Sequence, residues 1–190
     1  DRDTNVRWRV PLPDRGNSTP IVWDQQVFLT QAIEQQHQRT LMSIDRHTGR
    51  TLWQDSVHYD KEDPTHKTNP YCSPSPVTDG QRVIAWFGSA GLHCWDMQGK
   101  RLWIADLGPQ RHMWGYASSP VIFQDLLIVN GDHDGESYVV ALQLKTGKTV
   151  WKVARQYKTR SYVTPLIRNI NGQPQMVMSG SKSIVSLDPR

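Results

Sequence analysis

Hydrophobic positions along this chain fall in short runs of β-branched and aliphatic residues, and turn-forming residues separate the runs. The clearest set predicts strands at roughly 118–123, 125–131, 137–143 and 149–154. No segment keeps an apolar period of about 3.6 residues, so no amphipathic helix is predicted. Asp79-Gly80 is typical of a tight hairpin turn, because both residue types tolerate positive φ. The pattern therefore predicts an all-β fold.

Two independent markers reveal an internal repeat. Tryptophans recur at intervals of 45, 50 and 48 residues, at Trp8, Trp53, Trp103 and Trp151. A Ser/Thr-Pro pair followed by an aliphatic residue recurs at intervals of 56, 44 and 45 residues, at Pro20, Pro76, Pro120 and Pro165. A shared period near 45 residues indicates repeated supersecondary units.

The block before each tryptophan is the best-preserved part of the repeat. SIDRHTGRTLW at 43–53 matches ALQLKTGKTVW at 141–151 position by position, and CWDMQGKRLW at 94–103 is one residue shorter. SLDPR at 186–190 begins a fourth copy. Each repeat reads as four strands, which is typical of a propeller blade.

The predicted fold is a single β-propeller segment over residues 1–190, built from four-stranded antiparallel blades. About four blades are expected, as part of a ring of seven or eight. Their approximate bounds are 18–57, 71–106, 116–154 and 161–190. Residues 6–11 are expected to form an outer strand of a neighbouring blade. Two such chains could also pair as a homodimer that completes a ring.

Each block begins with a small residue and contains a turn glycine. We expect an indole to lie flat against the small residue, and burial of one indole to contribute at most roughly 5 kcal/mol. The residues expected to take part are Trp8, Trp53, Trp103, Trp151, Ser43, Cys94, Ala141, Gly49, Gly99 and Gly147. Cys94 is then a buried free thiol. A disulfide to Cys72 is not expected, because the two cysteines lie about two strand spacings of 4.8 Å apart.

The block A-x-D-x-x-T-G-[KR]-x-x-W resembles the tryptophan-docking motif of pyrroloquinoline-quinone (PQQ)-type propellers over nearly the whole chain. That superfamily includes quinone- and Ca²⁺-dependent dehydrogenases, and also non-enzymatic members such as the lipoprotein of the outer-membrane β-barrel assembly machinery. Residues 6–12 and 114–120 look most like bacterial secreted propellers. The resemblance implies a periplasmic or secreted location, although no signal-peptide core is present at 1–5.

The resemblance to the dehydrogenases is incomplete. Those enzymes carry adjacent cysteines over the quinone, whereas this sequence has no Cys-Cys pair and no convincing match to their calcium ligands. No catalytic residue is assigned, since no nucleophile elbow, Walker loop or zinc-protease motif occurs. We expect no cofactor. A PQQ- and Ca²⁺-dependent dehydrogenase with its catalytic residues outside this segment remains an alternative.

Strand order places the loops between blades, and those between second and third strands, on one side of the propeller. Near 34–38, 58–70, 107–116, 131–136 and 155–161 these loops carry five histidines: His37, His58, His66, His112 and His133. Aromatic and arginine residues are favoured interface anchors. The candidate binding residues are therefore Tyr71, His112, Trp114, Tyr116, Arg160 and Tyr162. The three tyrosines could instead plug the axial channel.

Two loops carry groups of acidic residues. Asp132, Asp134 and Glu136 begin like a calcium loop, but the rest of that loop is missing, so they are weak metal candidates beside a plain hairpin. Asp60, Glu62 and Asp63 are expected to be solvated.

Charge and composition exclude other partners. The formal net charge is +4 with no basic cluster, so no nucleic-acid binding is predicted. No apolar run of about 18 residues predicts membrane insertion. The leading interpretation is a non-catalytic scaffold that binds a protein or another ligand through the loops around its axis. A carbohydrate-binding propeller is a further alternative, because aromatic loops permit it.

Overall fold

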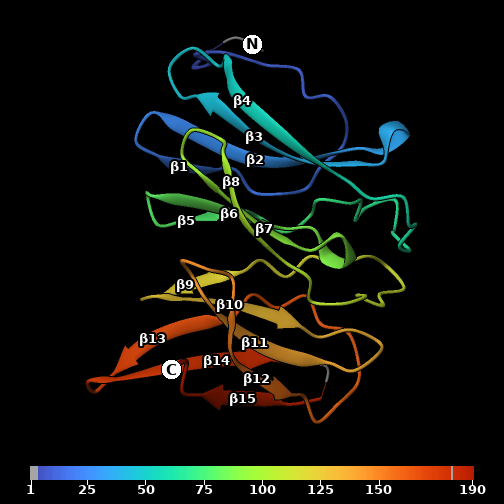
Figure 1. The fold of residues 1–190 in the computed structure, drawn as a ribbon, viewed down its shortest axis with the longest axis vertical. Helices are drawn as coiled ribbons and strands as arrows, with labels where there is room; N and C mark the ends of the chain where they lie inside the picture. Colours follow the sequence, from blue (N-terminus) through green and yellow to red (C-terminus); the bar gives the residue numbers. More distant parts are fainter. Residues whose placement is uncertain (1–3, 181) are drawn as a thin grey trace.

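The computed structural model describes residues 4–180 and 182–190, which form four antiparallel sheets stacked in chain order (Figure 1). Blade 1 contains β1 (Ile21–Trp23), β2 (Gln26–Ile33), the 3₁₀ helix η1 (Glu34–Gln36), β3 (Gln38–Asp45) and β4 (Thr51–His58). Blade 2 contains β5 (Val77–Thr78), β6 (Arg82–Trp86), the 3₁₀ helix η2 (Gly88–Ala90), β7 (Leu92–Asp96) and β8 (Arg101–Ala105). Blade 3 contains β9 (Val121–Phe123), β10 (Leu126–Gly131), β11 (Tyr138–Gln143) and β12 (Thr149–Ala154). Blade 4, in its described part, contains β13 (Leu166–Ile170), β14 (Gln173–Ser179) and β15 (Ile184–Leu187).

These sheets confirm the predicted all-β fold of about four blades. Each strand pairs with its neighbour in sequence, and the strands of blade 3 begin within three residues of the expected positions. The expected strand at 6–11 is not seen: no strand is assigned there in the described structure. A strand needs a paired neighbour, whereas this segment is fixed by a side chain, since Trp8 Nε1 donates to the carbonyl of Arg46 at 2.9 Å.

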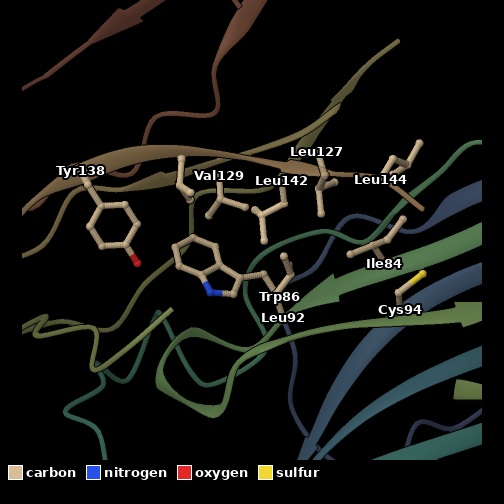
Figure 2. Close-up of a cluster of buried hydrophobic side chains, with 10 residues drawn as sticks. Ile84, Trp86, Leu92, Cys94, Leu127, Val129, Tyr138, Leu142 and Leu144 are labelled. Atoms are coloured by element: carbon tan, nitrogen blue, oxygen red, sulfur yellow. The ribbon is translucent and has the colours of Figure 1, made fainter. Parts of the chain in front are cut away.

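Hydrophobic side chains from facing blades form a separate core at each of the three interfaces. The core between blades 2 and 3 joins Ile84, Trp86 and Leu92 to Leu127 and Val129 (Figure 2). Burial of both faces explains the near-continuous apolar run of β6. Because side chains alternate along a strand, Ile84 and Trp86 face blade 3 while Val83 and Ala85 belong to the core with blade 1.

The other two cores follow the same plan. Phe28 and Leu41 of blade 1 meet Trp95 and Phe87 of blade 2. Ile128, Val139 and Ala141 of blade 3 meet Met176 and Met178 of blade 4. Each blade is therefore held mainly by its neighbours, which is the expected behaviour of repeat architectures.

Three of the repeated tryptophans contact the turn of the following blade. The indole nitrogens of Trp53 and Trp103 donate to the carbonyls of Met97 and Leu144, at 3.0 and 3.1 Å. A Cβ added to Gly99 would lie 2.7 Å from the Trp53 ring. A Cβ added to Gly147 would lie 2.5 Å from the Trp103 ring, and one added to Gly49 would lie 2.8 Å from the Trp8 ring. All three glycines have positive φ, so the position is restricted by conformation as well as by space.

The small residue predicted beside Trp53, Trp103 and Trp151 is in each case the direct cross-strand partner of the tryptophan. Ser43 pairs with Trp53, Cys94 with Trp103 and Ala141 with Trp151. A β-bulge follows at the same place in all three blades, where the register shifts by one residue. The recurring bulge explains why the sequence block is so well preserved.

Both cysteines are buried free thiols. Burial raises the pKa of each thiol, Cys72 and Cys94, to about 12. They are therefore protonated at neutral pH and unreactive. In the described part of the chain, no helix is long and apolar enough to cross a membrane.

Candidate binding site on the loop side

The two ends of the strands differ in kind. We call the side that carries the tight turns, such as β1–β2 and β13–β14, the turn side, and it lies at the left of Figure 1. The opposite side, here called the loop side, gathers the longer segments 34–37, 59–70, 106–116, 132–137 and 155–161. All candidate binding residues from the sequence belong to this side or to the entry of the first strands.

The five loop-side histidines do not form one cluster. His37 and His58 lie together, with ring centroids 6.2 Å apart, and His58 Nε2 is 2.8 Å from Asp60. His112 instead lies beside Tyr162, at 5.7 Å between ring centroids. His133 packs edge-on against Tyr138 at 6.1 Å. The shared histidine-rich face predicted from the sequence is therefore divided between blade 1 and blades 2 to 4.

Carboxylates and cations pair one to one between the loops 132–136 and 155–160. Arg155 binds Asp132, with Nε 2.9 Å from Oδ1. Arg160 Nη1 binds both oxygens of Asp134 at 2.7 and 2.6 Å. Lys158 binds Glu136 at 2.5 Å. The three weak metal candidates therefore do not converge, because each carboxylate has its own cation. The described residues contain no group of three His, Cys, Asp or Glu side chains that could hold a metal ion.

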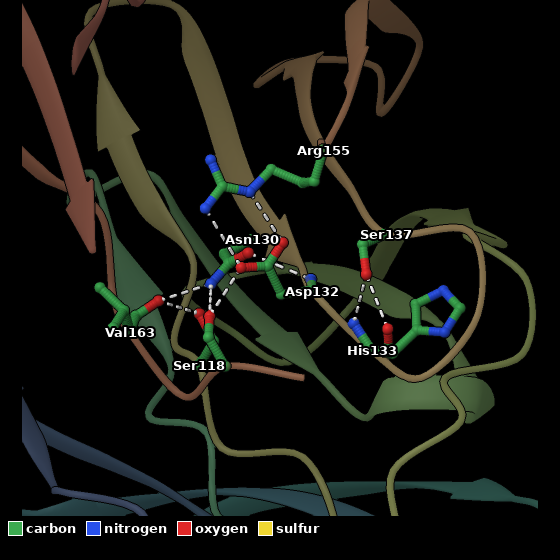
Figure 3. A network of polar contacts seen from close by, with 8 residues as sticks. Ser118, Asn130, Asp132, His133, Ser137, Arg155 and Val163 are labelled. Atoms are coloured by element: carbon green, nitrogen blue, oxygen red, sulfur yellow. Dashed lines mark hydrogen bonds and ion pairs between the residues drawn. The ribbon is translucent and has the colours of Figure 1, made fainter. Parts of the chain in front are cut away.

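A buried polar network fixes the base of the 131–137 loop (Figure 3). Asp132 is 3% exposed and accepts hydrogen bonds from Arg155 and from Ser161 Oγ, the latter at 2.8 Å. Asn130 Nδ2 donates to Ser161 Oγ and to the carbonyl of Val163, at 3.0 and 2.9 Å. Buried polar groups stabilise a fold only when they are satisfied, and this carboxylate is. The network is structural and ties blade 3 to the entry of blade 4.

Tyr71 is held between loop and sheet. Its hydroxyl donates to the carbonyl of Asp63 at 2.7 Å, and the Arg39 guanidinium lies 3.6 Å from its ring centroid. Burial raises the pKa of Tyr71 above its ordinary value, although Arg39 opposes the shift. Burial also raises the pKa of the Asp63 carboxyl, while Ser89 and Arg39 lower it. Asp63 is therefore not the fully solvated carboxylate that the sequence predicted.

Tyr116 is not a surface anchor, in contrast to the expectation from the sequence. It is 3% exposed, and its ring packs beside Trp86 at 5.8 Å and against Gly88. Gly88 has a φ of 61°, and a side chain there would collide with the tyrosine ring. Burial raises the pKa of Tyr116 well above its ordinary value. The filling role considered as the alternative describes Tyr116 better than a binding role.

His112 is also buried, at 4% exposed. Burial lowers the pKa of its imidazole to about 4, and the neighbouring His133 and Arg160 act in the same direction. The ring is therefore neutral at pH 7, and it supports Tyr162 from below the surface. Tyr162 itself is 39% exposed and available to a ligand.

Trp114 is the most accessible aromatic residue of the candidate set, at 48% exposed. The Arg160 guanidinium lies 4.6 Å from its ring centroid, and the Asn69 side-chain amide donates to its carbonyl at 2.6 Å. The loop that carries Trp114 is thus attached to the 59–70 segment by Asn69. Gly115, with a φ of 78°, allows Asn69 to approach closely.

Two depressions flank the stretch 112–114. The first, here called the Met113 cleft, has a volume of about 400 Å³ and is lined by Asp63, Pro64, Pro109, Gln110, Arg111, His112, Met113 and Asp134. The second, here called the Trp114 groove, has a volume of about 440 Å³ and is lined by His66, Thr68, Asn69, Trp114, Ala117 and Tyr162. The first contains charges and an exposed methionine, whereas the second contains only neutral and aromatic residues and one histidine.

Of the six residues predicted as a binding face, four come together: His112, Trp114, Arg160 and Tyr162. Tyr71 and Tyr116 lie deeper, beside Arg39. Sequence reasoning missed Met113, Thr68 and Asn69. The sequence singles out these three residues only by their position in the least regular loops, where the repeat pattern does not apply.

The described residues do not fit a PQQ–calcium site. A calcium site needs several converging oxygen ligands, and the carboxylates that the sequence offers are each paired with a separate cation. The two cysteines are buried, protonated and far apart in sequence, so they cannot form a vicinal disulfide.

The four antiparallel blades and the repeated tryptophan block define a β-propeller of the PQQ-like repeat class. The family model described as outer membrane protein assembly factor BamB matches residues 1–113 and 43–190, which together span the chain. The chain therefore belongs to this family. No curated protein sequence matches it.

Solved structures share the fold. BamB from Moraxella catarrhalis is similar with a TM-score of 0.64 and 17% identity, over 96% of this chain and 51% of that one. A europium-containing methanol dehydrogenase has a TM-score of 0.55 and 15% identity, over 73% of this chain and 24% of that one. Quinohemoprotein alcohol dehydrogenase ADHIIG from Pseudomonas putida HK5 has a TM-score of 0.56 and 20% identity, over 77% and 22%. This chain thus spans about half the length of the BamB structure and less of the dehydrogenases.

Proposed function

We propose that this chain is part of a non-catalytic, periplasmic or secreted propeller scaffold that binds a protein partner through its loop side. The observation that carries the proposal is the Met113 cleft. Met113 is 59% exposed, and the cleft combines it and two prolines with the charged side chains of Asp63, Arg111 and Asp134. Apolar centres with charged rims, methionine and arginine are typical of protein interfaces.

Family membership supports a protein partner and a location outside the cytoplasm, because the family is described by an outer membrane assembly factor. The fold alone would not separate this reading from a dehydrogenase, since both kinds of protein share it. The paired carboxylates and protonated thiols favour the non-catalytic reading. We further propose that the contacts of Trp53 and Trp103 with the following turns are docking contacts that fix the blades.

Site-specific photo-crosslinking in the native cells tests the partner proposal. A photoreactive residue in place of Met113 in the full-length protein should yield a discrete cross-linked protein. The matched control carries the same residue in place of Lys145, which is exposed on the turn side and should yield none. No cross-link from position 113, or equal products from both positions, would contradict the proposal.

The dehydrogenase alternative has its own test. Calorimetric titration of the full-length protein with PQQ in the presence of Ca²⁺ should give no saturable binding. One-to-one binding would make the quinone-dependent enzyme the better assignment.

A further inference from the structure

The Trp114 groove differs chemically from the Met113 cleft next to it. Its lining contains two accessible aromatic side chains, Trp114 at 48% and Tyr162 at 39% exposed, and no lysine, arginine or carboxylate. The Arg160 guanidinium lies 4.6 Å from the Trp114 ring centroid, and both oxygens of Asp134 bind it. A ligand that fits this lining is therefore neutral, because a charged group would be partly desolvated without a partner.

Two residues that line the groove, His66 and Asn69, carry polar atoms suited to binding a ligand. The backbone N–H of Thr68 donates to His66 Nδ1 at 3.3 Å, and Nδ1 lies 2.8 Å from the Thr68 hydroxyl. Because Nδ1 accepts this hydrogen bond, the ring carries a proton on Nε2, which is therefore a donor. Asn69 Nδ2 donates a hydrogen bond to the Trp114 carbonyl, and the side-chain oxygen Oδ1 is an acceptor for a ligand. The short antiparallel bridge between His66 and Asn69 fixes the backbone of both residues.

We propose that the Trp114 groove is a binding site for a neutral saccharide. A sugar hydroxyl donates and accepts through one oxygen, so it can pair with His66 Nε2–H and with Asn69 Oδ1. The C–H face of a pyranose ring is apolar and suits the electron-rich face of Trp114 or Tyr162. The volume of about 440 Å³ lies within the range of about 300–1,000 Å³ that small-molecule sites have.

An apolar side chain of a protein partner would occupy the same space less well. It would cover His66 Nε2–H and Asn69 Oδ1 without pairing with them, and unsatisfied buried polar groups are costly. The Met113 cleft has the apolar and charged residues that a protein needs, so the two depressions suit different ligands. The saccharide proposal does not depend on the protein partner proposed above.

Calorimetric titration of the full-length protein with maltotriose, cellotriose and chitotriose tests the site. At least one of them should bind saturably in the millimolar range or tighter, and tryptophan fluorescence should change in parallel. Trp114→Ala should raise the Kd about tenfold or more, and Trp114→Phe, which keeps a ring, should raise it less. Val150→Ala is the control, because Val150 is 55% exposed on the outer strand β12 and does not line the groove, and it should leave the Kd unchanged.

Circular dichroism and the unfolding midpoint of each variant separate loss of the site from loss of the fold. Absence of saturable binding by all three oligosaccharides would overturn the proposal. Binding that Trp114→Ala leaves unchanged would also overturn it, because the ligand would then sit elsewhere. A protein cross-link from position 113 that persists in Trp114→Ala would leave the scaffold proposal intact in either case.

Discussion

The turn side and the loop side of this propeller join the same strands by opposite means. On the turn side, each connection is short and uniform, and a glycine such as Gly99 or Gly147 receives an indole from the preceding blade. On the loop side, the connections differ in length and are fixed by individual ion pairs, such as Asp132–Arg155. The glycine–indole contacts that recur on the turn side are occupied in holding neighbouring blades together. Variable loops on a regular scaffold are where binding residues are found most often in proteins.

The variant with the largest expected effect tests whether the stability of the loop side depends on its buried ion pair. Arg155→Leu leaves the Asp132 carboxylate, 3% exposed, without its cation, and should lower the free energy of unfolding by about 3–5 kcal/mol. The matched control is Lys158→Leu, because the Lys158–Glu136 pair is mostly exposed. Guanidinium unfolding should show no measurable change for the control. Equal midpoints for both variants would mean that the loop side is held by packing alone.

The next effect tests whether the turn side depends on close contact with the indole. Gly99→Ala places a Cβ 2.7 Å from Trp53 at a φ of 88° and should destabilise the protein by about 3 kcal/mol. Gly172 has a similar φ of 82° with no atom within 4 Å of an added Cβ. Gly172→Ala therefore measures the backbone strain alone, which should cost about 1 kcal/mol. If the two variants unfold at the same denaturant concentration, the indole contact contributes nothing.

The smallest effect concerns pH and the loop side. Burial lowers the pKa of His112 from an ordinary 6.5 to about 4, so the unfolded chain binds a proton in this range before the folded chain does. Stability is therefore present above pH 6.5 and falls as the pH drops toward 4. Between pH 7 and pH 5 this residue should account for about 2 kcal/mol of lost stability.

The pH dependence is isolated by a difference measurement. Unfolding is followed at pH 7 and pH 5 for the natural protein, for His112→Gln and for His47→Gln, an exposed histidine on the turn side. His112→Gln should have a shallower pH dependence, and His47→Gln should match the natural protein. An unaltered slope in His112→Gln would show that this imidazole is not buried neutral.

The fold was predictable because it depends on local spacing that recurs. The interval from Ser43 to Trp53 reappears from Ala141 to Trp151, and in both copies the two end residues pair across β-strands. The partner blade of each tryptophan was not predictable. Trp103 meets Leu144, which is 41 residues away, and nothing near Trp103 in the sequence specifies that turn.

The site was predictable only in outline. Trp114, Tyr162 and Arg160 were expected on one face because they follow strands of adjacent blades. Tyr116 follows the same rule, yet it is buried because Gly88 leaves room for its ring. The contact between Asn69 and Trp114 depends on the path of two irregular loops, and hydrophobic periodicity carries no information about such paths.

The contact of each indole with the next turn also bears on how such a chain could grow during evolution. One repeat supplies one tryptophan to the blade ahead of it and one glycine to the blade behind it, so its two ends are complementary. A segment one repeat long can therefore be duplicated from almost any starting point in the sequence. The copy still contains one tryptophan and one turn glycine for the contacts with its neighbours. The duplicated sequence segment need not begin and end at the same residues as the structural blade.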